Sequence, residues 1–179
     1  MAQMATHRLA GLRDGIVLLH TDGARYSRAS LDIVAELAAS GREGLVITAN
    51  RPYHVLRAAL AEAGVAGRVR YLDCVSGLTG LAPPPDPDAT FVESPTLLEK
   101  ILLRTEQLLR RMPAPRFLVL DSLSTLAVYN GTPAVVELAH TLVNRLRHLE
   151  TLAILVLVEK QAGEELSDAV TPLCDTVLR

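Results

Sequence analysis

Apolar and polar positions follow two different periods along this chain. Short, nearly continuous apolar runs are bounded by glycine, proline or polar residues, and such runs are typical of strands buried on both faces of a sheet. Because the run at 151–159 is apolar almost throughout, we expect it to lie inside the sheet and not at an edge. The predicted strands are Gly15–His20, Gly44–Asn50, Arg68–Val75, Arg116–Asp121 and Thr151–Glu159.

Between these runs, apolar residues recur three and four positions apart, which predicts amphipathic helices. Gly41 and Gly64 mark helix ends, and Pro52 suits the first turn of a helix. A short helix follows the last of these strands, and a closing strand is expected at 175–179. The predicted helices span about 27–40, 52–64, 95–112, 132–149 and 164–173.

Strands that alternate with helices favour an α/β fold, in which helices cover both faces of a mostly parallel sheet as a three-layer α/β/α sandwich. No repeat or domain boundary interrupts the alternation, so residues 1–179 are expected to form a single domain. Residues 76–95 are rich in proline and glycine and are expected to lack regular structure over most of their length. A connection this long is either functional or a mobile surface loop.

Parallel strands place their carboxyl ends along one edge of a sheet, where open α/β sheets bind ligands. Polar residues follow the predicted strands there, as they do in any fold of this kind. Their chemical types therefore decide whether the edge is a site. These residues are His20, Asn50, Arg51, Asp73, Asp121, Ser122, Glu159 and Lys160.

The loop after the first strand has the place and length of a phosphate-binding loop. Such a loop uses glycines to close backbone N–H groups around phosphates, a lysine to neutralise charge and a hydroxyl to bind magnesium. His20 and Arg25 stand at the two glycine positions. Tyr26 stands at the lysine position, and Ser27 alone keeps the expected residue type. As a bare motif, the loop fails the match.

The fourth predicted strand ends in Asp121 and Ser122. An apolar strand that ends in aspartate is the magnesium-coordinating strand of P-loop enzymes. In the alternative interpretation, Asp121 and Ser122 only cap and turn the chain after the strand.

In combination, these segments resemble the RecA-like ATPase domain of the KaiC family over nearly the whole chain. The resemblance rests on the order of strands and helices and on the sequence Asp-Ser-Leu-Ser at 121–124, a frequent form of that family's Walker B segment. A terminal aspartate and strand at 175–179 close the domain in the same way. The resemblance implies a RecA-like fold.

The residues that carry catalysis in the KaiC family are replaced here. Its catalytic glutamates, which polarise the attacking water, correspond to Asn50 and Arg51; asparagine cannot act as a general base, and arginine has the opposite charge. Together with the degenerate Walker A loop, these losses should cost several orders of magnitude in rate. The resemblance therefore implies a pseudo-ATPase without catalytic residues, in which ATP and magnesium are not expected and Asp121 would be the ligand of any magnesium. The vestigial nucleotide site would comprise His20, Gly23, Arg25, Tyr26, Ser27, Asn50, Arg51, Asp121 and Ser122.

Composition and charge limit the kinds of partner that we expect this protein to bind. The chain of 179 residues is 49% hydrophobic with a formal charge of −2, which favours a globular protein and argues against a nucleic-acid or membrane surface. Four tyrosines, two phenylalanines and no tryptophan leave few groups on which bases could stack. The N-terminus lacks the apolar core of a signal peptide, and the two cysteines have no C-x-x-C spacing, so we expect a cytoplasmic protein.

Three functions remain open. We favour a non-catalytic regulatory or scaffolding module that binds a protein partner or forms a homo-oligomer, because RecA-like domains commonly assemble side by side. Tyrosine and arginine are enriched in interface cores. The candidate interface residues, expected to be exposed, are Arg25, Tyr26, Tyr53 and Tyr129. The alternative for each tyrosine is a half-buried residue that packs within the domain.

In both alternative functions, the protein binds a small ligand or a substrate. In the first, the protein senses a nucleotide or phosphate ligand without hydrolysis, or less plausibly retains weak ATPase activity. Arg25, Ser27 and Arg28 near a helix N-terminus would then attract the anion. In the second, it is a hydrolase or metal enzyme, although no pair of its residues has close metal-ligand spacing. The residues of that enzyme would be His20, Asp73, Asp121 and Glu159.

Overall fold

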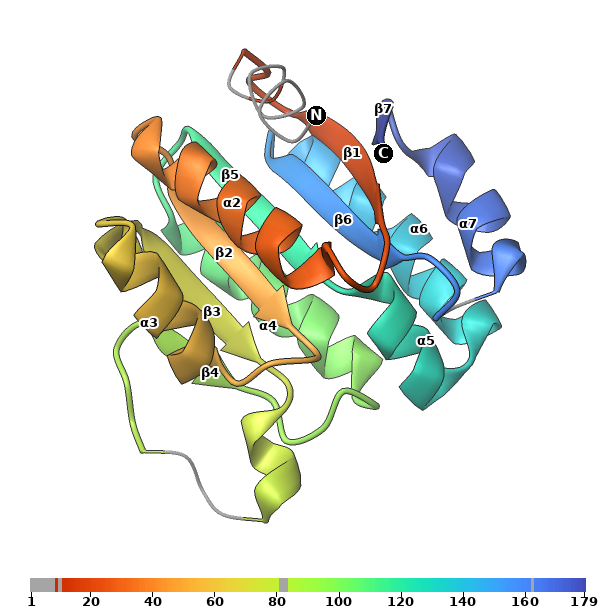
Figure 1. Cartoon of the computed structure of the whole chain (residues 1–179), viewed down its shortest axis with the longest axis horizontal. Helices are drawn as coiled ribbons and strands as arrows, with labels where there is room; N and C mark the ends of the chain where they lie inside the picture. Colours follow the sequence, from red (N-terminus) through yellow and green to blue (C-terminus); the bar gives the residue numbers. More distant parts are fainter. Residues whose placement is uncertain (1–8, 10, 81–83, 162) are drawn as a thin grey trace.

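Seven strands form one sheet in the computed structural model, which describes residues 9, 11–80, 84–161 and 163–179 (Figure 1). Their order across the sheet is β4-β3-β2-β5-β6-β1-β7, and every neighbouring pair runs parallel. The predicted α/β fold with a mostly parallel sheet is confirmed. The strands are β1 (Gly15–Thr21), β2 (Glu43–Thr48), β3 (Val69–Asp73), β4 (Ala89–Phe91), β5 (Arg116–Asp121), β6 (Leu152–Val158) and β7 (Thr176–Leu178).

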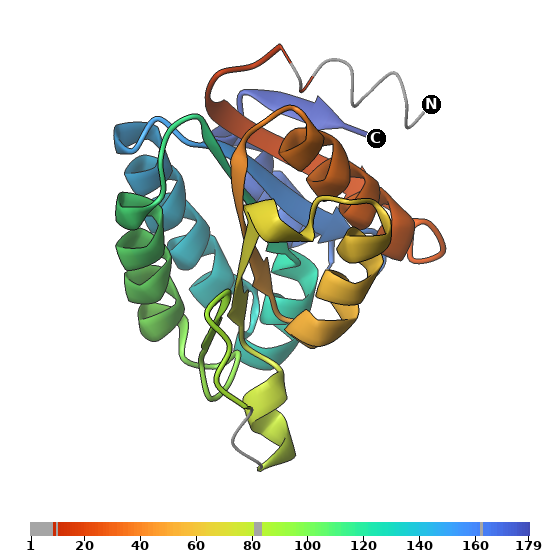
Figure 2. The same cartoon turned by 90° about the vertical axis from the view of Figure 1, so that its left-hand side faces the viewer.

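Helices cover both faces of this sheet and complete three layers (Figure 2). Two helices, α2 and α3, pack on one face, and α4, α5, α6 and α7 pack on the other. None of the helices in the described residues is long and apolar enough to cross a membrane. The helices are α2 (Tyr26–Ala39), α3 (Tyr53–Glu62), α4 (Leu98–Arg111), α5 (Leu123–Asn130), α6 (Thr132–His148) and α7 (Glu164–Val170), with 3-10 turns η1 (Ala66–Arg68), η2 (Ser76–Thr79) and η3 (Thr171–Leu173).

Successive residues of β1 enter two separate hydrophobic cores. Ile16 and Leu18 pack towards α6, while Val17 and Leu19 pack towards α2, because neighbouring side chains of a strand point to opposite faces of the sheet. Coverage on both faces explains why β5 and β6 read as nearly continuous apolar runs. Since β6 lies between β5 and β1, the prediction that 151–159 is an interior strand is confirmed.

The segment at 76–95 has more regular structure than its composition predicted. It contains η2 and the edge strand β4. The backbone on either side of β4 is tied to β3, because Tyr71 N donates to Asp88 O and Asp73 O accepts from Val92 N, each at 2.8 Å. Backbone bonds of this kind leave no side-chain period in the sequence. Residues 81–83 of this segment, and residues 1–8 and 10, where the absence of a signal peptide was predicted, lie outside the described residues.

Helix α5 was not predicted. Its first four residues are all buried although two of them, Ser124 and Thr125, are polar, so the start of the helix has no exposed polar face and no amphipathic period. Ser122 begins it, because the Ser122 Oγ accepts a hydrogen bond from Thr125 N at 3.1 Å. Ser122 is therefore a helix cap, as one interpretation of the sequence proposed.

Candidate functional site

Asp121 lies at the carboxyl end of β5, beside the end of β2. The register of these two strands pairs Asp121 with Thr48, so the loop after β2 passes directly over Asp121. The side chain of Asp121 is fully buried. A carboxylate removed from water in this way is costly unless it is paired and hydrogen-bonded. The partners of Asp121 therefore define what this edge of the sheet can do.

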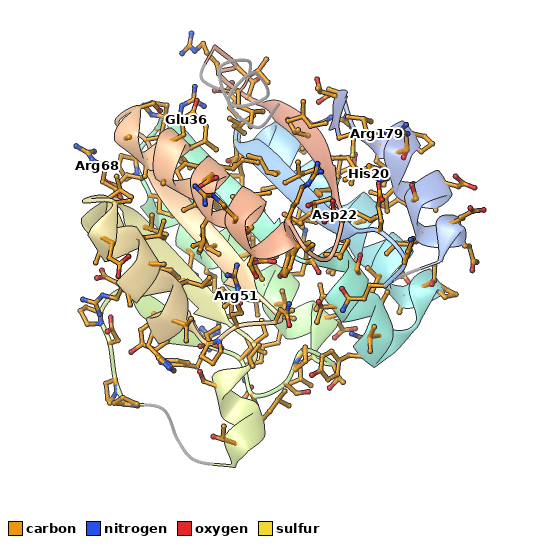
Figure 3. The ribbon with its side chains drawn as sticks, viewed as in Figure 1. His20, Asp22, Glu36, Arg51, Arg68 and Arg179 are labelled. Carbon is orange, nitrogen blue, oxygen red and sulfur yellow. The ribbon has the colours of Figure 1, made fainter. Side chains whose placement is uncertain are left out.

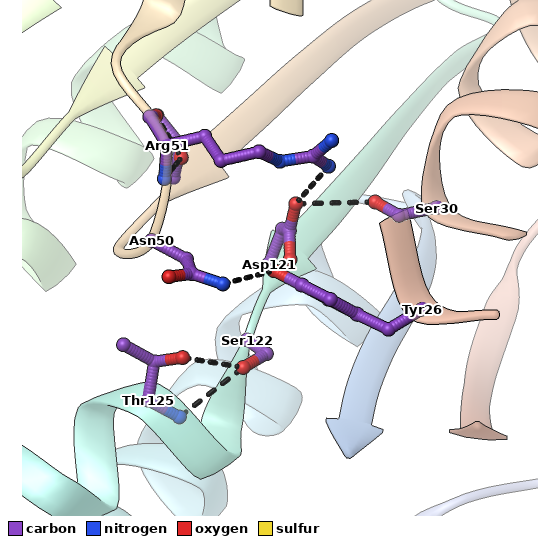
Figure 4. A network of polar contacts seen from close by, with 8 residues as sticks. Tyr26, Ser30, Asn50, Arg51, Asp121, Ser122 and Thr125 are labelled. Carbon is purple, nitrogen blue, oxygen red and sulfur yellow. Dashed lines mark hydrogen bonds and ion pairs between the residues drawn. The ribbon is translucent and has the colours of Figure 1, made fainter. Parts of the chain in front are cut away.

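Three side chains of the same chain donate to the carboxylate of Asp121 (Figure 4). The Tyr26 hydroxyl donates to Oδ1. Oδ2 accepts from Ser30 Oγ at 3.2 Å and from Arg51 Nη2 at 3.1 Å, and the contact with Arg51 is also an ion pair. Both carboxylate oxygens are bonded, and the charge is balanced from within the protein.

The donors to Asp121 also contact one another. The guanidinium carbon of Arg51 lies 5.6 Å from the centre of the Tyr26 ring, within the range of a cation–π interaction. Asn50 Nδ2 donates to the Tyr26 hydroxyl oxygen at 3.1 Å. Burial and the negative charge of Asp121 raise the pKa of Tyr26 well above its usual range, so the phenol keeps its proton and remains a donor. We call Tyr26, Ser30, Asn50, Arg51 and Asp121 the Asp121 cluster.

The loop between β1 and α2 is closed by its own hydrogen bonds. Tyr26 N donates to Asp22 O at 2.9 Å, and Arg25 N donates to the Asp22 carboxylate at 2.8 Å. A phosphate-binding loop instead turns such N–H groups towards the anion. Gly23 does not have a positive φ. This glycine therefore does not provide the left-handed backbone conformation for which phosphate-binding loops use glycine.

The hydroxyl that reaches Asp121 is that of Ser30 and not that of Ser27. Tyr26 and Ser30 are four residues apart and therefore share the inner face of α2. Ser27 is exposed and lines a shallow groove between α2 and α3. Comparison with the phosphate-binding loop pointed to Ser27, because Ser27 follows the residue at the lysine position. The same comparison did not identify Ser30. The signal that could have found Ser30 is the inward spacing of Tyr26, Ser30, Ile33 and Leu37.

Asp73 and His20 belong to other arrangements. The buried carboxylate of Asp73 accepts hydrogen bonds from the backbone N–H groups of Tyr53, Val75 and Ser76, at 2.8 to 2.9 Å, and so fixes the start of α3 and the turn after β3. His20 lies at the end of β1, and its Nε2 is buried without a hydrogen-bond partner. Burial lowers the pKa of His20. In the described part of the chain, no three His, Cys, Asp or Glu side chains are placed to hold a metal ion.

The expectation that Tyr26 and Tyr53 are exposed is wrong. Their exposed fractions are 6% and 7%. Tyr26 is held in the Asp121 cluster, and Tyr53 packs edge-on against Phe91, with the ring centres 5.4 Å apart. Of the four candidate interface residues, Arg25 and Tyr129 are exposed.

The parallel sheet order, the loop between β1 and α2, and Asp121 at the end of β5 define an α/β protein of the RecA/KaiC-like fold. Two solved structures from Pyrococcus horikoshii show the same fold. The KaiC-like protein PH0186 from strain OT3 has a TM-score of 0.65 at 16% identity, over 91% of this chain and 69% of that one. The uncharacterized protein PH0321, solved in complex with an unknown peptide, has a TM-score of 0.69 at 14% identity, over 91% and 76%.

The chain belongs to a family of unknown function, DUF7504, whose model matches residues 5–179. No curated protein matches the sequence significantly. The fold is therefore shared with KaiC-like proteins, while the family description assigns no function.

Proposed function

We propose that this protein is a non-hydrolysing member of the RecA/KaiC-like fold that acts as a regulatory or scaffolding module, by binding a protein partner or further copies of itself. One observation carries the proposal. Asp121, at the position of the magnesium-coordinating aspartate, is fully buried and bonded by Tyr26, Ser30 and Arg51 of its own chain. Both oxygens of the carboxylate already accept hydrogen bonds from side chains of the same chain.

A magnesium ion would have to displace these donors. Mg²⁺ demands near-octahedral geometry and keeps several of its waters, whereas the space around Asp121 is filled by the Tyr26 ring and the Arg51 guanidinium. Arg51 also carries a positive charge to within 3.1 Å of the carboxylate, and a second cation there would be repelled. No lysine stands in the loop to neutralise a phosphate, and the loop N–H groups of Arg25 and Tyr26 are already bonded to Asp22.

Exposed apolar side chains supply the surface for a partner. Val128 and Tyr129, near the end of α5, are 64% and 44% exposed, and Leu97, just before α4, is 40% exposed. Asn130 Nδ2 donates to Pro95 O at 3.0 Å and so holds these two segments together. Exposed apolar groups at one edge of a domain often mark interaction surfaces. PH0321, which has a similar fold, was solved in complex with an unknown peptide. That complex agrees with a role in protein binding and does not identify a partner.

Two measurements test the proposal together. The first is hydrolysis of ATP and GTP with magnesium, with a thermal-shift series of ATP, ADP and GTP at millimolar concentration with and without magnesium. We expect no turnover and no shift. Turnover would contradict the proposal, and a shift without turnover would favour the nucleotide-sensor alternative.

The second measurement is sedimentation velocity combined with affinity capture from cell extract. The paired variant Val128→Ser/Tyr129→Ser is compared with Leu103→Ser, which changes an exposed leucine in the middle of α4. We expect an oligomer or a captured partner that the paired variant loses and the control keeps. A strict monomer without a partner would contradict the proposed role.

A further inference from the structure

A pocket of about 420 Å³ opens between α2 and the β1–β7 side of the sheet. Its volume falls in the range of small-molecule sites, roughly 300 to 1,000 Å³. The pocket is separate from the Asp121 cluster, since none of the five cluster residues lines it. Its apolar floor is formed by Leu19 of β1, Leu178 of β7, and Ala29 and Ile33 of α2.

Three of the polar residues that line the pocket lie at or just after the ends of three neighbouring strands. In the sheet order β6-β1-β7, Glu159 follows β6, His20 lies near the end of β1 and Arg179 follows β7. Figure 3 shows His20 and Arg179 on this side of the molecule. An acidic residue, Glu159, and a basic residue, Arg179, thus lie on opposite sides of His20. Their backbones are separated by about two strand spacings of roughly 4.8 Å each.

These three groups have bonding capacity left over. Across the described residues, the side chains of Glu159 and Arg179 make no ion pair or hydrogen bond with another side chain, and His20 Nε2 is buried without a partner. Because His20 Nε2 is buried, a ligand in the pocket would bond to the exposed side chains of Glu159 and Arg179 and not to this nitrogen. By contrast, the pocket's other two arginines, Arg25 and Arg28, are already in ion pairs.

We propose that this pocket binds a small zwitterion with an apolar body, of the class of a free hydrophobic α-amino acid. The apolar body lies on the floor, the carboxylate meets Arg179, and the ammonium meets Glu159. The charges of the lining favour this class over a nucleotide, because three arginines are balanced by Asp22, Asp32 and Glu159. A polyphosphate carries several negative charges and would meet those three carboxylates. The proposal is independent of the function proposed for the Asp121 cluster.

The test is a titration with L-phenylalanine and L-leucine, followed by NMR of the methyl groups of Leu19, Ile33 and Leu178 in the full chain with any tag at the N-terminus. Matched analogues separate the two charges: 3-phenylpropionate keeps the anion, 2-phenylethylamine keeps the cation, and N-acetylphenylalanine amide keeps neither. We expect saturable shifts with the amino acids, at a Kd of about a millimolar or lower. Each one-charge analogue should bind about tenfold more weakly or worse, because a hydrogen bond to a charged group is lost.

Variants locate the site. Ala29→Phe fills the pocket, and Ala35→Phe on the same helix fills the groove on the other side of α2 as the matched control. Ala29→Phe should abolish binding and Ala35→Phe should leave it unchanged, with thermal melts to verify folding. Arg179→Gln and Glu159→Gln are exposed changes that leave the core intact, and each should weaken L-phenylalanine binding about tenfold.

Three results would overturn the proposal. The first is the absence of saturable shifts with any amino acid. The second is equal binding of L-phenylalanine and N-acetylphenylalanine amide, which would show that the charges play no part. The third is binding that survives Ala29→Phe or both glutamine changes, which would place the ligand elsewhere.

Discussion

Replacing Arg51 by methionine should destabilise the protein strongly. Methionine retains an apolar stem of similar length, so the change removes the charge and its hydrogen bond while it keeps most of the packing. Asp121 would remain fully buried without its cation. Removing one partner of a buried ion pair costs about 3–5 kcal/mol. Because the Arg51 side chain is 18% exposed, we take the lower end, about 3 kcal/mol.

This loss is large beside the ~5–15 kcal/mol that stabilises a typical domain. In a domain of this size, 1 kcal/mol shifts the melting temperature by about 2–4 °C, so Arg51→Met should melt roughly 6–12 °C lower. Calorimetry and urea unfolding measure the effect. The matched control is Arg28→Met, whose side chain is 89% exposed in its pair with Asp32. This control should change stability by less than about 0.5 kcal/mol.

A double-mutant cycle separates the ion pair from general damage. Asparagine at position 121 is uncharged and still accepts hydrogen bonds, so Asp121→Asn should recover part of the stability lost in Arg51→Met. A coupling energy of about 0.5–3 kcal/mol is expected for such contacting residues. A loss below about 1 kcal/mol in Arg51→Met, or the absence of rescue in the double variant, would refute the idea that Arg51 neutralises Asp121.

Three further predictions concern individual residues. The pKa of Tyr26 is raised above its ordinary value of 10.0. The stability that the protonated Tyr26 hydroxyl contributes is therefore fully present below pH 10.0 and is lost as the pH rises further. In unfolding curves at alkaline pH, the stability advantage of the wild type over Tyr26→Phe should shrink. Asp73→Ala should cost about 2–4 kcal/mol in urea unfolding, because buried backbone N–H groups lose their acceptor; an unchanged midpoint would contradict this role. Gly44→Ala should cost about 1–3 kcal/mol, because its Cβ would lie 2.3 Å from the Phe117 ring, whereas Gly67→Ala meets nothing within 4 Å and serves as the control.

Most of the sheet is predictable from the sequence because its strands are buried on both faces. Burial of that kind requires apolar residues at successive positions, as in β5 and β6. The elements that were not predicted are those without a periodic pattern of apolar residues in the sequence. Strand β4 is three residues long and is held by backbone bonds, and α5 begins with four buried residues in a row.

The site was predictable in position but not in its contacts. Comparison with the KaiC family places Tyr26, Arg51 and Asp121 at one edge of the sheet. Their mutual bonding depends on how the loop after β2 folds back over β5, which no local pattern records. Ser30 was missed because it follows from the helical register set by Tyr26, the first residue of α2. The predictions of a pseudo-ATPase, of a protein partner and of the cytoplasm stay predictions.

The central claim is that the Asp121 cluster occupies the place of a bound metal and nucleotide. A crystal structure grown with millimolar Mg²⁺ and ATP tests it most directly. We predict that Tyr26 and Arg51 keep their contacts with Asp121 and that no nucleotide lies on the loop at 20–27. Phosphates on that loop, with Asp121 holding a magnesium-bound water and Tyr26 displaced, would contradict the claim.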